Sequence, residues 1–398
     1  MKTNEKDTKQ GIVPALRFPE FQNAGEWVYL EGNKVFEQIS NRKHNSNLPI
    51  LAISQEHGAV PRDLIDYKVI VSDEGIENYK VVGVGDFIIS LRSFQGGIEY
   101  SAYNGICSPA YIILRKRLDV DNQFFKYYFK SRTFIRDLNK NLEGIRDGKM
   151  VSYKQFSEIL LPIPSIHNKK EQQRIADCLS SIDALIKAAE NKIEELQAHK
   201  KGLMQQLFPA EGETVPALRF PEFQNAGEWT KISLGELTYK VSKKNKAGKL
   251  YPIYSINNKQ GFIRQEEQFT GVDSNDRGYD LSLYSIVGSK TFAYNPARIN
   301  VGSIGYSGEL KDVIISSLYV CFKTSETVND EFLLKYFETE SFKKAVLNSV
   351  EGGIRSYLFY DNFAKINLYL PPNYDIAEQQ KIADCLSSVD DLIMAQTN

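Results

Sequence analysis

The stretch VPALRFPEFQNAGEW occupies residues 13–27, and the same fifteen letters return at residues 215–229. A second pair of related segments follows: EQQRIADCLSSIDALI at 171–186 and EQQKIADCLSSVDDLI at 378–393, identical at thirteen of sixteen positions. Self-similarity on this scale is typical of a repeated structural unit. The sequence therefore predicts one fold that is built twice in a chain of 398 residues.

The regions between these markers, 28–164 and 230–372, differ in sequence but keep a common aromatic skeleton. Four aromatic residues recur 208 positions later: Phe124, Tyr128, Phe129 and Phe134 match Phe332, Tyr336, Phe337 and Phe342. Their helical spacing favours a core role over base stacking. Short β-branched and aromatic runs indicate strands, and the segments 122–139 and 329–347 each indicate an amphipathic helix. Each region is predicted to be a mixed α/β (α+β) domain.

A long helix is predicted over residues 169–208, because apolar residues alternate spacings of four and three as in a coiled-coil seam. The seam residues are Ile175, Leu179, Ile182, Ile186, Ile193, Leu196, Leu203 and Leu207, and the second copy has Ile382, Leu386, Val389 and Ile393 in the same register. At 1.5 Å per residue, the first helix spans about 60 Å. We expect the two helices to pair through these seams and to act as a spacer between the domains.

Composition places the chain among globular proteins, with 42 % apolar residues, 25 % charged residues and a net charge of −1. The first eleven residues lack the apolar core of a secretory signal, and no apolar run is long enough to cross a bilayer, so we expect a cytoplasmic protein without membrane contact. The four scattered cysteines are expected to be reduced thiols. The near-zero net charge requires any nucleic-acid binding to come from local basic patches or a partner.

The sequence shows no constellation typical of catalysis. The segment GSKT at 288–291 lacks the glycine spacing of a phosphate-binding loop, and YNPARIN at 294–300 lacks the second proline of an amino-methyltransferase loop. The four histidines show no metal-ligand spacing, and no Ser/His/Asp or Cys/His set is evident. We therefore expect no catalytic residue, no metal and no cofactor in this chain.

Binding to a polyanion is the chemistry that remains. Two basic segments, NRKHN at 41–45 and KVSKKNKAGK at 240–249, follow the start of each domain, and their candidates for DNA phosphate are Arg42, Lys43, Lys243 and Lys244. Loops rich in Arg, Lys, Asn and Gln supply the residue types that read base edges. The base-reading candidates are Arg92, Gln95, Arg146 and Lys149 in the first domain and Lys290, Asn295, Arg298 and Arg355 in the second. Ordinary solvated loops are the alternative, and a structural role for the repeat-related Arg146 and Arg355 stays open.

The two doubled motifs, LRFPEF…GEW and EQQ[RK]IADCLSS, resemble those of the specificity subunit of type I restriction-modification systems, over nearly the whole chain. The resemblance implies two target recognition domains that each read one half of a split double-stranded DNA site. It also implies an antiparallel coiled coil between the long helices, two methylation (M) subunits and two restriction (R) subunits as partners, and no catalysis by the chain itself. S-adenosylmethionine, ATP and Mg are expected in the partner subunits. The repeated segments would give each methylation subunit an equivalent docking surface.

The expected organisation follows the repeat. Its parts are a polar tail at 1–12, target recognition domain 1 at 13–168, a central spacer helix at 169–208, a linker at 209–216, target recognition domain 2 at 217–374 and a second spacer helix at 375–398. The second helix is shorter, since Asn398 is equivalent to Asn191. The overhang from Lys192 to Phe208 would be exposed unless a partner or the N-terminal tail covers it, and we expect a partner to do so.

Two other functions are weighed against this one. A coiled-coil scaffold with two protein-binding domains and no direct DNA role would share the duplicated plan, and sequence-specific retention of duplex DNA would separate the two. A self-sufficient methyltransferase would bind S-adenosylmethionine as an isolated chain, which the missing glycine-rich and Asn-Pro-Pro motifs disfavour.

Overall fold

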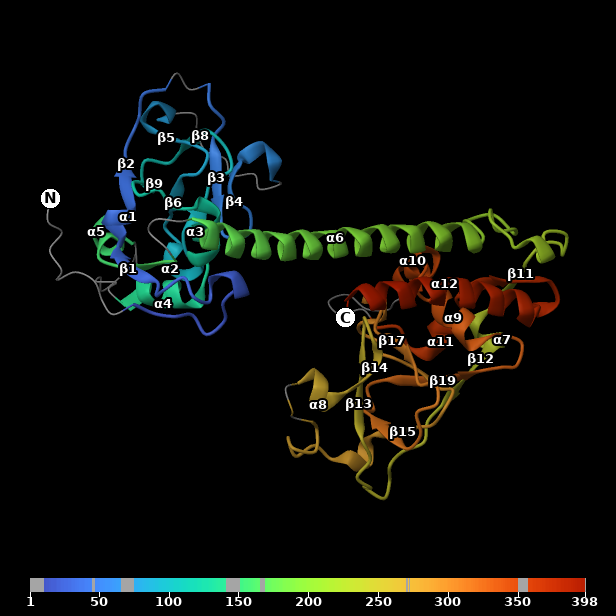
Figure 1. The fold of residues 1–398 in the computed structure, drawn as a ribbon. Coiled ribbons are helices and arrows are strands. Elements are labelled where there is room, and N and C mark those ends of the chain that lie inside the picture. Colours follow the sequence, from blue (N-terminus) through green and yellow to red (C-terminus); the bar gives the residue numbers. More distant parts are fainter. Residues whose placement is uncertain are drawn as a thin grey trace, which may run out of the picture. The chain divides into compact units, whose positions relative to one another are not determined.

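The chain forms two compact units, Met1–Lys187 and Ala188–Asn398, called domain 1 and domain 2 below (Figure 1). The computed structural model describes residues 11–44, 47–65, 75–140, 151–164, 169–269, 271, 273–349 and 357–397. Each domain contains sheets and short helices, which agrees with the predicted mixed α/β class. None of the helices in these ranges combines the length and apolar character needed to cross a bilayer.

The described residues of domain 1 form one four-stranded sheet and three two-stranded ribbons. The sheet has the order β2 (Phe36–Ile39), β9 (Ile112–Lys116), β6 (Phe87–Ile89) and β7 (Glu99–Tyr100). The ribbons pair β1 (Val28–Glu31) with β10 (Leu160–Ile163), β3 (Leu51–Ser54) with β4 (Gly58–Pro61), and β5 (Lys80–Val82) with β8 (Gly105–Cys107). The helices are α1 (Gly32–Val35), α2 (Ser93–Gly96), α3 (Asn122–Tyr128), α4 (Arg132–Lys140) and α5 (Tyr153–Ser157), with 3-10 turns η1 (Pro19–Phe21), η2 (Arg62–Leu64) and η3 (Ile76–Asn78).

Domain 2 repeats this order of elements. One four-stranded sheet has the order β12 (Thr238–Val241), β19 (Val320–Thr324), β16 (Phe292–Tyr294) and β17 (Ile304–Tyr306), and a second has β14 (Gly261–Arg264), β13 (Ile253–Asn257), β18 (Val313–Ile315) and β15 (Ser285–Val287). β11 (Thr230–Ser233) pairs with β20 (Asn367–Leu370). The helices are α7 (Leu234–Leu237), α8 (Gln265–Gln268), α9 (Asp330–Tyr336), α10 (Glu340–Ser349), α11 (Tyr360–Phe363) and α12 (Ile376–Thr397), with 3-10 turns η4 (Pro221–Phe223), η5 (Leu281–Leu283), η6 (Ile299–Val301) and η7 (Pro372–Tyr374).

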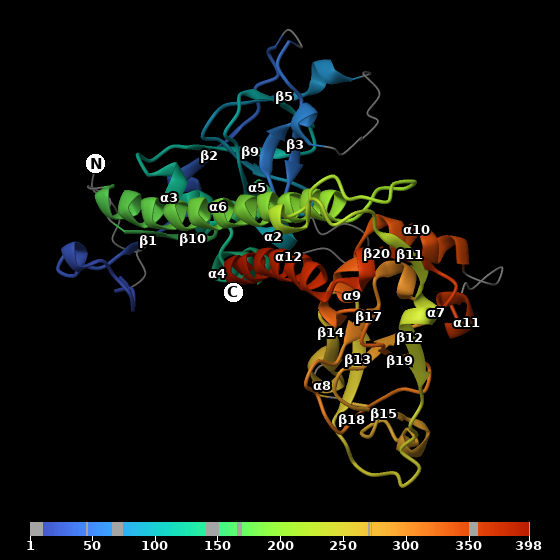
Figure 2. The same cartoon turned by 90° about the vertical axis from the view of Figure 1, so that its right-hand side faces the viewer.

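The strand orders show that the two domains share one topology. The sheet β2-β9-β6-β7 corresponds to β12-β19-β16-β17, strand for strand. The parallel pairing of β13 with β18 has its counterpart in a single parallel bridge between Ile50 and Ile106. In domain 2 this pairing joins four strands into one sheet, and Figures 1 and 2 place β15 of that sheet far from α12. The prediction of one fold built twice is confirmed.

The shared aromatic skeleton forms the core of each domain. Phe124 and Phe332 are buried, and their backbone amides donate to the helix-capping side chains of Asp121 and Asn329 at 2.9 Å. These N-caps start α3 and α9 at equivalent positions and turn the aromatic residues inward. The buried rings that surround them pack edge to face or tilted, at centroid distances typical of aromatic cores. The predicted core role of this skeleton is confirmed.

The predicted long helix is α6 (Lys170–Leu207), which begins in domain 1 and ends in domain 2. Its last turns are not an uncovered overhang, because Leu207 is 1 % exposed and Phe208 is 7 % exposed. Both belong to the core of domain 2 together with Leu386 of α12. The expectation that a partner or the N-terminal tail covers these residues is therefore wrong. Domain 2 covers them itself, since the chain returns to the same domain directly after the helix.

Candidate nucleic-acid interface

The two doubled motifs bind each other in each domain. Arg17 donates from Nε and Nη2 to the two carboxylate oxygens of Glu171, both at 2.7 Å, and from Nη1 to a backbone carbonyl of its own segment. Arg219 makes the same bidentate contact with Glu378 at 2.7 and 2.8 Å. All four side chains are at least nine-tenths buried. Paired, buried ions of this geometry fix the start of each helix against its domain.

The glutamine that follows each of these glutamates has a second structural role. Gln172 accepts from the backbone amide of Asp121 at 2.8 Å, and Gln379 accepts from that of Asn329 at 2.8 Å. Asp121 and Asn329 are the N-cap residues of α3 and α9. The repeated motifs therefore form the same hydrogen-bonded frame in both domains.

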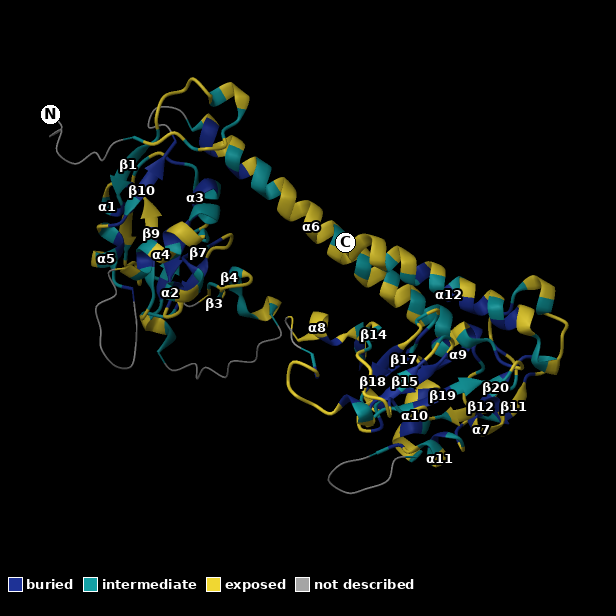
Figure 3. Cartoon of the chain, turned by 90° about the horizontal axis from the view of Figure 1, so that it is seen from below, coloured by how far each residue is buried: buried dark blue, intermediate teal, exposed yellow. Residues whose placement is uncertain are grey.

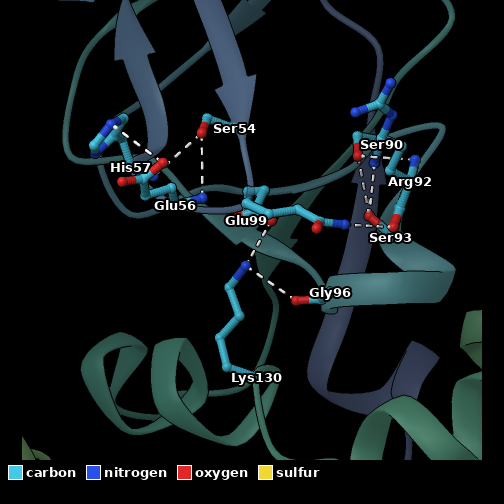
Figure 4. Close-up of polar contacts among 10 residues, drawn as sticks. Ser54, Glu56, His57, Ser90, Arg92, Ser93, Gly96, Glu99 and Lys130 are labelled. Atoms are coloured by element: carbon cyan, nitrogen blue, oxygen red, sulfur yellow. Dashed lines mark hydrogen bonds and ion pairs between the residues drawn. The ribbon is translucent and has the colours of Figure 1, made fainter. Parts of the chain in front are cut away.

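The loop that carries Arg92 and Gln95 in domain 1 follows β6 and is anchored by its backbone (Figure 4). Gln55 donates from Nε2 to the carbonyl of Arg92 at 3.0 Å, and Lys130 donates from Nζ to the carbonyl of Gly96 at 3.1 Å. The side chains of Arg92 and Gln95 are exposed. In Figure 4 the guanidinium of Arg92 points away from Lys130. A fixed backbone with outward-facing donors suits contact with an external acceptor.

A charge pair between the half-buried Lys130 and the buried Glu99 supports this loop. Lys130 lies 2.5 Å from Glu99, whose side chain is 2 % exposed, and burial raises the pKa of the Glu99 carboxyl while Lys130 opposes that rise. Gly97 closes the loop with a φ of 83°, a conformation that favours glycine. A Cβ atom at this position would lie 2.0 Å from the carbonyl oxygen of Phe129. The loop geometry therefore depends on a glycine at position 97.

The corresponding loop in domain 2 follows β16 and carries Asn295 and Arg298. Asn295 is half-buried, and its Oδ1 accepts from the amide of Ala297 at 3.0 Å, so this oxygen shapes the turn. Arg298 is exposed at the start of η6. Because β16 is the counterpart of β6, the structure brings Arg298 and Arg92 to equivalent places on the two domains.

Lys290 lies in the turn between β15 and β16. Its side chain is exposed, its φ is 52°, and its backbone amide donates to the carbonyl of Gly308 at 2.7 Å. The counterpart in domain 1 is the turn at Gly85, whose amide donates to the carbonyl of Ser101 at 2.9 Å. Lys290 therefore occupies a left-handed position that holds a glycine in the other domain, and domain 2 has a cation where domain 1 has none.

The phosphate candidates lie in the loops between β2 and β3 and between β12 and β13, which are equivalent in the repeat. Arg42, Lys43 and Lys243 are exposed. Lys244 differs, because its Nζ donates to the carbonyl of Leu283 at 3.1 Å and to the hydroxyl of Ser285 at 3.3 Å. The Lys244 ammonium therefore ties two segments of domain 2 together, which the local charge pattern did not reveal.

Three base-reading candidates, Arg146, Lys149 and Arg355, lie outside the described residues. Sequence reasoning missed the tips of the hairpins β3–β4 and β13–β14, which adjoin the candidate loops in both domains. Gln55 and His57 are exposed at the first tip, and Asn258 and Lys259 at the second. Their signal was a short polar run between two alternating strands, which is typical of any hairpin.

The described residues include no group of three or more His, Cys, Asp or Glu side chains that could hold a metal ion. Burial raises the pKa of the Cys107 thiol to about 12 and that of the Cys321 thiol to about 11. A nucleophilic cysteine has a lowered pKa, so the raised pKa values of these two thiols disfavour a nucleophilic role. The chemistry of the described loops is that of hydrogen-bond donors and cations.

Two copies of one α/β topology, each fixed to a long helix by a buried Arg–Glu pair, define a tandem-domain protein. The type I restriction modification DNA specificity domain matches residues 20–198 and 226–398. The chain belongs to this family, and it is a DNA specificity subunit of a type I restriction-modification system.

Known relatives agree with this assignment. The type I restriction enzyme MjaVIII specificity subunit of Methanocaldococcus jannaschii is 26 % identical over 333 residues, which are 79 % of this chain and 74 % of the relative. The type I restriction-modification S subunit from M. genitalium has a similar fold, with a TM-score of 0.54 at 14 % identity over 97 % of this chain and 94 % of that one. A chain from a study of complex assembly and conformational transition of a type I R-M system gives a TM-score of 0.54 at 14 % identity over 96 % of this chain and 94 % of that one.

Proposed function

We propose that each domain reads one part of a bipartite double-stranded DNA site. The observation that carries this proposal is the equivalence of the loops after β6 and β16, which share one position in the fold but differ in side chains. Arg92 and Gln95 stand on the first loop, and Asn295 and Arg298 on the second. Arginine reads guanine edges and glutamine or asparagine reads adenine edges in the major groove. One frame with two different loops suits two different half-sites.

The basic loops between the second and third strands of each domain supply the phosphate contacts in this proposal. Arg42 and Lys43 serve domain 1 and Lys243 serves domain 2, because all three are exposed. Phosphate contacts fix the position of a protein on the duplex without reading its sequence. The near-zero net charge of the chain makes these local cations the main source of attraction.

The long helices form an antiparallel coiled coil in this proposal and set the separation of the half-sites. Support comes from the part of α6 that belongs to domain 2. Lys200 Nζ lies 2.7 Å from Asp390 Oδ1 of α12, and Leu207 shares a core with Ile382 and Leu386 of α12. Residue 200 of α6 thus lies beside residue 390 near the end of α12, as an antiparallel pair requires.

Catalysis belongs to partner subunits in this proposal. Two methylation subunits and two restriction subunits join the chain, and S-adenosylmethionine, ATP and Mg are bound there. The outer faces of the opening segments 13–27 and 215–229 supply equivalent docking surfaces. The two segments have the same sequence, and the same Pro-Glu pair is exposed in each, as Pro19-Glu20 and as Pro221-Glu222. Equivalent surfaces suit two copies of one partner.

Methylome sequencing of a restriction-deficient host tests the proposal. One host carries the chain with its methylation subunit, and a control host carries the methylation subunit alone. The proposal expects a new split motif of methylated adenines only in the first host. An assembled complex, verified by size-exclusion chromatography, that produces no new motif would contradict it and favour a scaffold role.

A further inference from the structure

The end of α6 fills a hydrophobic site on domain 2. The ring of Phe208 lies 5.2 Å from that of Phe332 and 6.2 Å from that of Tyr336. Leu207 is buried in the same cluster, which also contains Ile382 and Leu386 at the start of α12, and Leu203 and Met204 pack against it. The last turns of α6 therefore pack against α12 and cover Ile382 and Leu386.

Polar contacts fix the orientation of the C-terminal end of α6 on domain 2. Lys200 Nζ lies 2.5 Å from Glu338 and 2.7 Å from Asp390, so a buried stem carries its charge to two carboxylates. The backbone amide of Leu218 donates to the carbonyl of Gln206 at 2.9 Å, which ties the helix end to the opening segment. The helix end that fills this site therefore has a lysine, two leucines one helical turn apart, and an aromatic residue at its end.

Domain 1 presents the apolar part of the same site, with Lys130 in place of Glu338 and Tyr127 in place of Lys335. The equivalent pairs are Trp27 and Trp229, Phe124 and Phe332, Tyr128 and Tyr336, Ile175 and Ile382, Leu179 and Leu386, Ile182 and Val389, and Asp183 and Asp390. Asp183 accepts from the hydroxyl of Tyr127 at 2.7 Å, as Asp390 accepts from Lys335 at the equivalent position. The carboxylate that meets Lys200 in domain 2 thus has an exposed counterpart in domain 1.

In the described part of domain 1, no segment takes the place of residues 200–208. Ile182 is 46 % exposed where Val389 is 6 % exposed, and Leu16 is 92 % exposed where Leu218 is 41 % exposed. Trp27 is half-buried, whereas Trp229 is 2 % exposed. Figure 3 colours much of the middle of α6 as exposed. As far as the described residues go, this site is therefore covered in domain 2 and uncovered in domain 1.

We propose that the face of domain 1 formed by Trp27, Tyr128, Ile175, Leu179, Ile182 and Asp183, here called the helix-end site, binds the last turns of a partner helix. The partner is an amphipathic helix with the pattern Lys-x-x-Leu-Met-x-x-Leu-Phe, which is the pattern of residues 200–208. Its lysine meets Asp183, its leucines cover Ile175, Leu179 and Ile182, and its aromatic residue packs on Tyr128. The apolar contacts and the contact of the lysine with Asp183 are taken from the filled copy in domain 2. Asp183 is the carboxylate of this site in domain 1, since Lys130 replaces Glu338 and pairs with Glu99.

A graft tests this proposal with the chain's own geometry. Residues 192–214 replace residues 1–12 and are joined to Val13. The joint reproduces the natural peptide between Thr214 and Val215, because residues 13–27 repeat residues 215–229. The backbone register is also preserved, since Trp27 pairs with Ile12 where Trp229 donates to Thr214. A matched control graft carries Leu203→Asp, Leu207→Asp and Phe208→Asp.

The readout is maleimide labelling of an introduced Ile182→Cys thiol, followed by mass spectrometry of the labelled peptide. The proposal expects the native graft to slow labelling at least about tenfold relative to the control graft, because a covered thiol reacts only when the site opens. A Val389→Cys variant reports that domain 2 is folded and stays slow in both grafts. Equal labelling of Cys at 182 in the two grafts, with the thiol at 389 still protected, would overturn the proposal.

Discussion

Arg17 and Glu171 are 154 residues apart in the chain and form two parallel hydrogen bonds of 2.7 Å. Arg219 and Glu378, 159 residues apart, repeat the arrangement. This relationship explains why the most similar segments of the two halves are the opening segment and the start of the helix. Each is one side of a buried clasp, so neither side can change without the other. The loops outside the clasp carry no such constraint.

Breaking one clasp is expected to destabilise its own domain. Glu171→Gln leaves the buried guanidinium of Arg17 with a neutral partner, and loss of one member of a buried ion pair costs about 3–5 kcal/mol. Urea unfolding monitored by proteolysis of domain 1 measures this cost. Glu20→Gln is the matched control, because Glu20 pairs with Arg174 at 3.3 Å on the exposed surface and contributes at most about 1 kcal/mol. Equal effects of the two substitutions would contradict the structural role of the clasp.

Two glycine substitutions are expected to change the free energy of unfolding in opposite directions. Gly97→Ala places a Cβ atom 2.0 Å from the carbonyl of Phe129 at a positive φ, so it destabilises domain 1 by at least about 1–3 kcal/mol. Gly202→Ala lies in α6 with no atom within 4 Å of the new Cβ, so it stabilises by up to about 1 kcal/mol. Thermal unfolding of both variants decides the question, and a destabilising Gly202→Ala would show that α6 is distorted there.

Removing exposed cations from the basic loops is expected to weaken DNA binding on all sequences alike. Lys43→Ala and Lys243→Ala each remove one phosphate contact and lower the slope of log K against log salt by about one. Fluorescence anisotropy of the assembled complex with cognate and unrelated duplexes, at several salt concentrations, measures the slope. Lys231→Ala, an exposed lysine on β11 outside the candidate loops and hairpin tips, is the control. An unchanged salt slope in both loop variants would show that these lysines do not contact DNA phosphate.

Thiol reactivity is expected to divide the four cysteines into two pairs. Burial raises the pKa of Cys107 to about 12 and of Cys321 to about 11, so both stay protonated at pH 8 and are also sterically covered. Cys178 and Cys385 on the long helices are only partly buried. Titration with a chromogenic disulfide at pH 8 should therefore count two fast thiols in the native chain and four in urea. Four fast thiols in the native chain would contradict the described cores.

The elements with a strong local pattern could be predicted from the sequence. The spacing of apolar residues predicted a helix over 169–208, and α6 covers Lys170–Leu207. The repeat predicted the shared topology, because Phe124 and Phe332 could be aligned before any strand was known. These signals are local or internal to the repeat, and tertiary packing preserves them.

Contacts made across the fold could not be predicted in the same way. Lys244 appeared equivalent to other exposed lysines, yet its ammonium donates to the carbonyl of Leu283, which is 39 residues away. Leu207 and Phe208 were expected to need a partner, but the return of the chain into domain 2 buries them. The base-reading role of Arg92, Gln95, Lys290, Asn295 and Arg298 stays a prediction, because surface exposure is shared by many loops.

The central claim is that each domain reads its own part of the DNA site. Methylome sequencing of hosts with Arg92→Ala or Arg298→Ala, each assembled with the methylation subunit, tests it most directly. Loss of a bidentate base contact costs about 1–3 kcal/mol of discrimination, so Arg92→Ala should relax one half of the methylated motif and Arg298→Ala the other. Arg136→Ala, on the exposed surface of α4, should leave both halves unchanged. Relaxation of the same half by both variants, or of neither half in an assembled complex, would contradict the account.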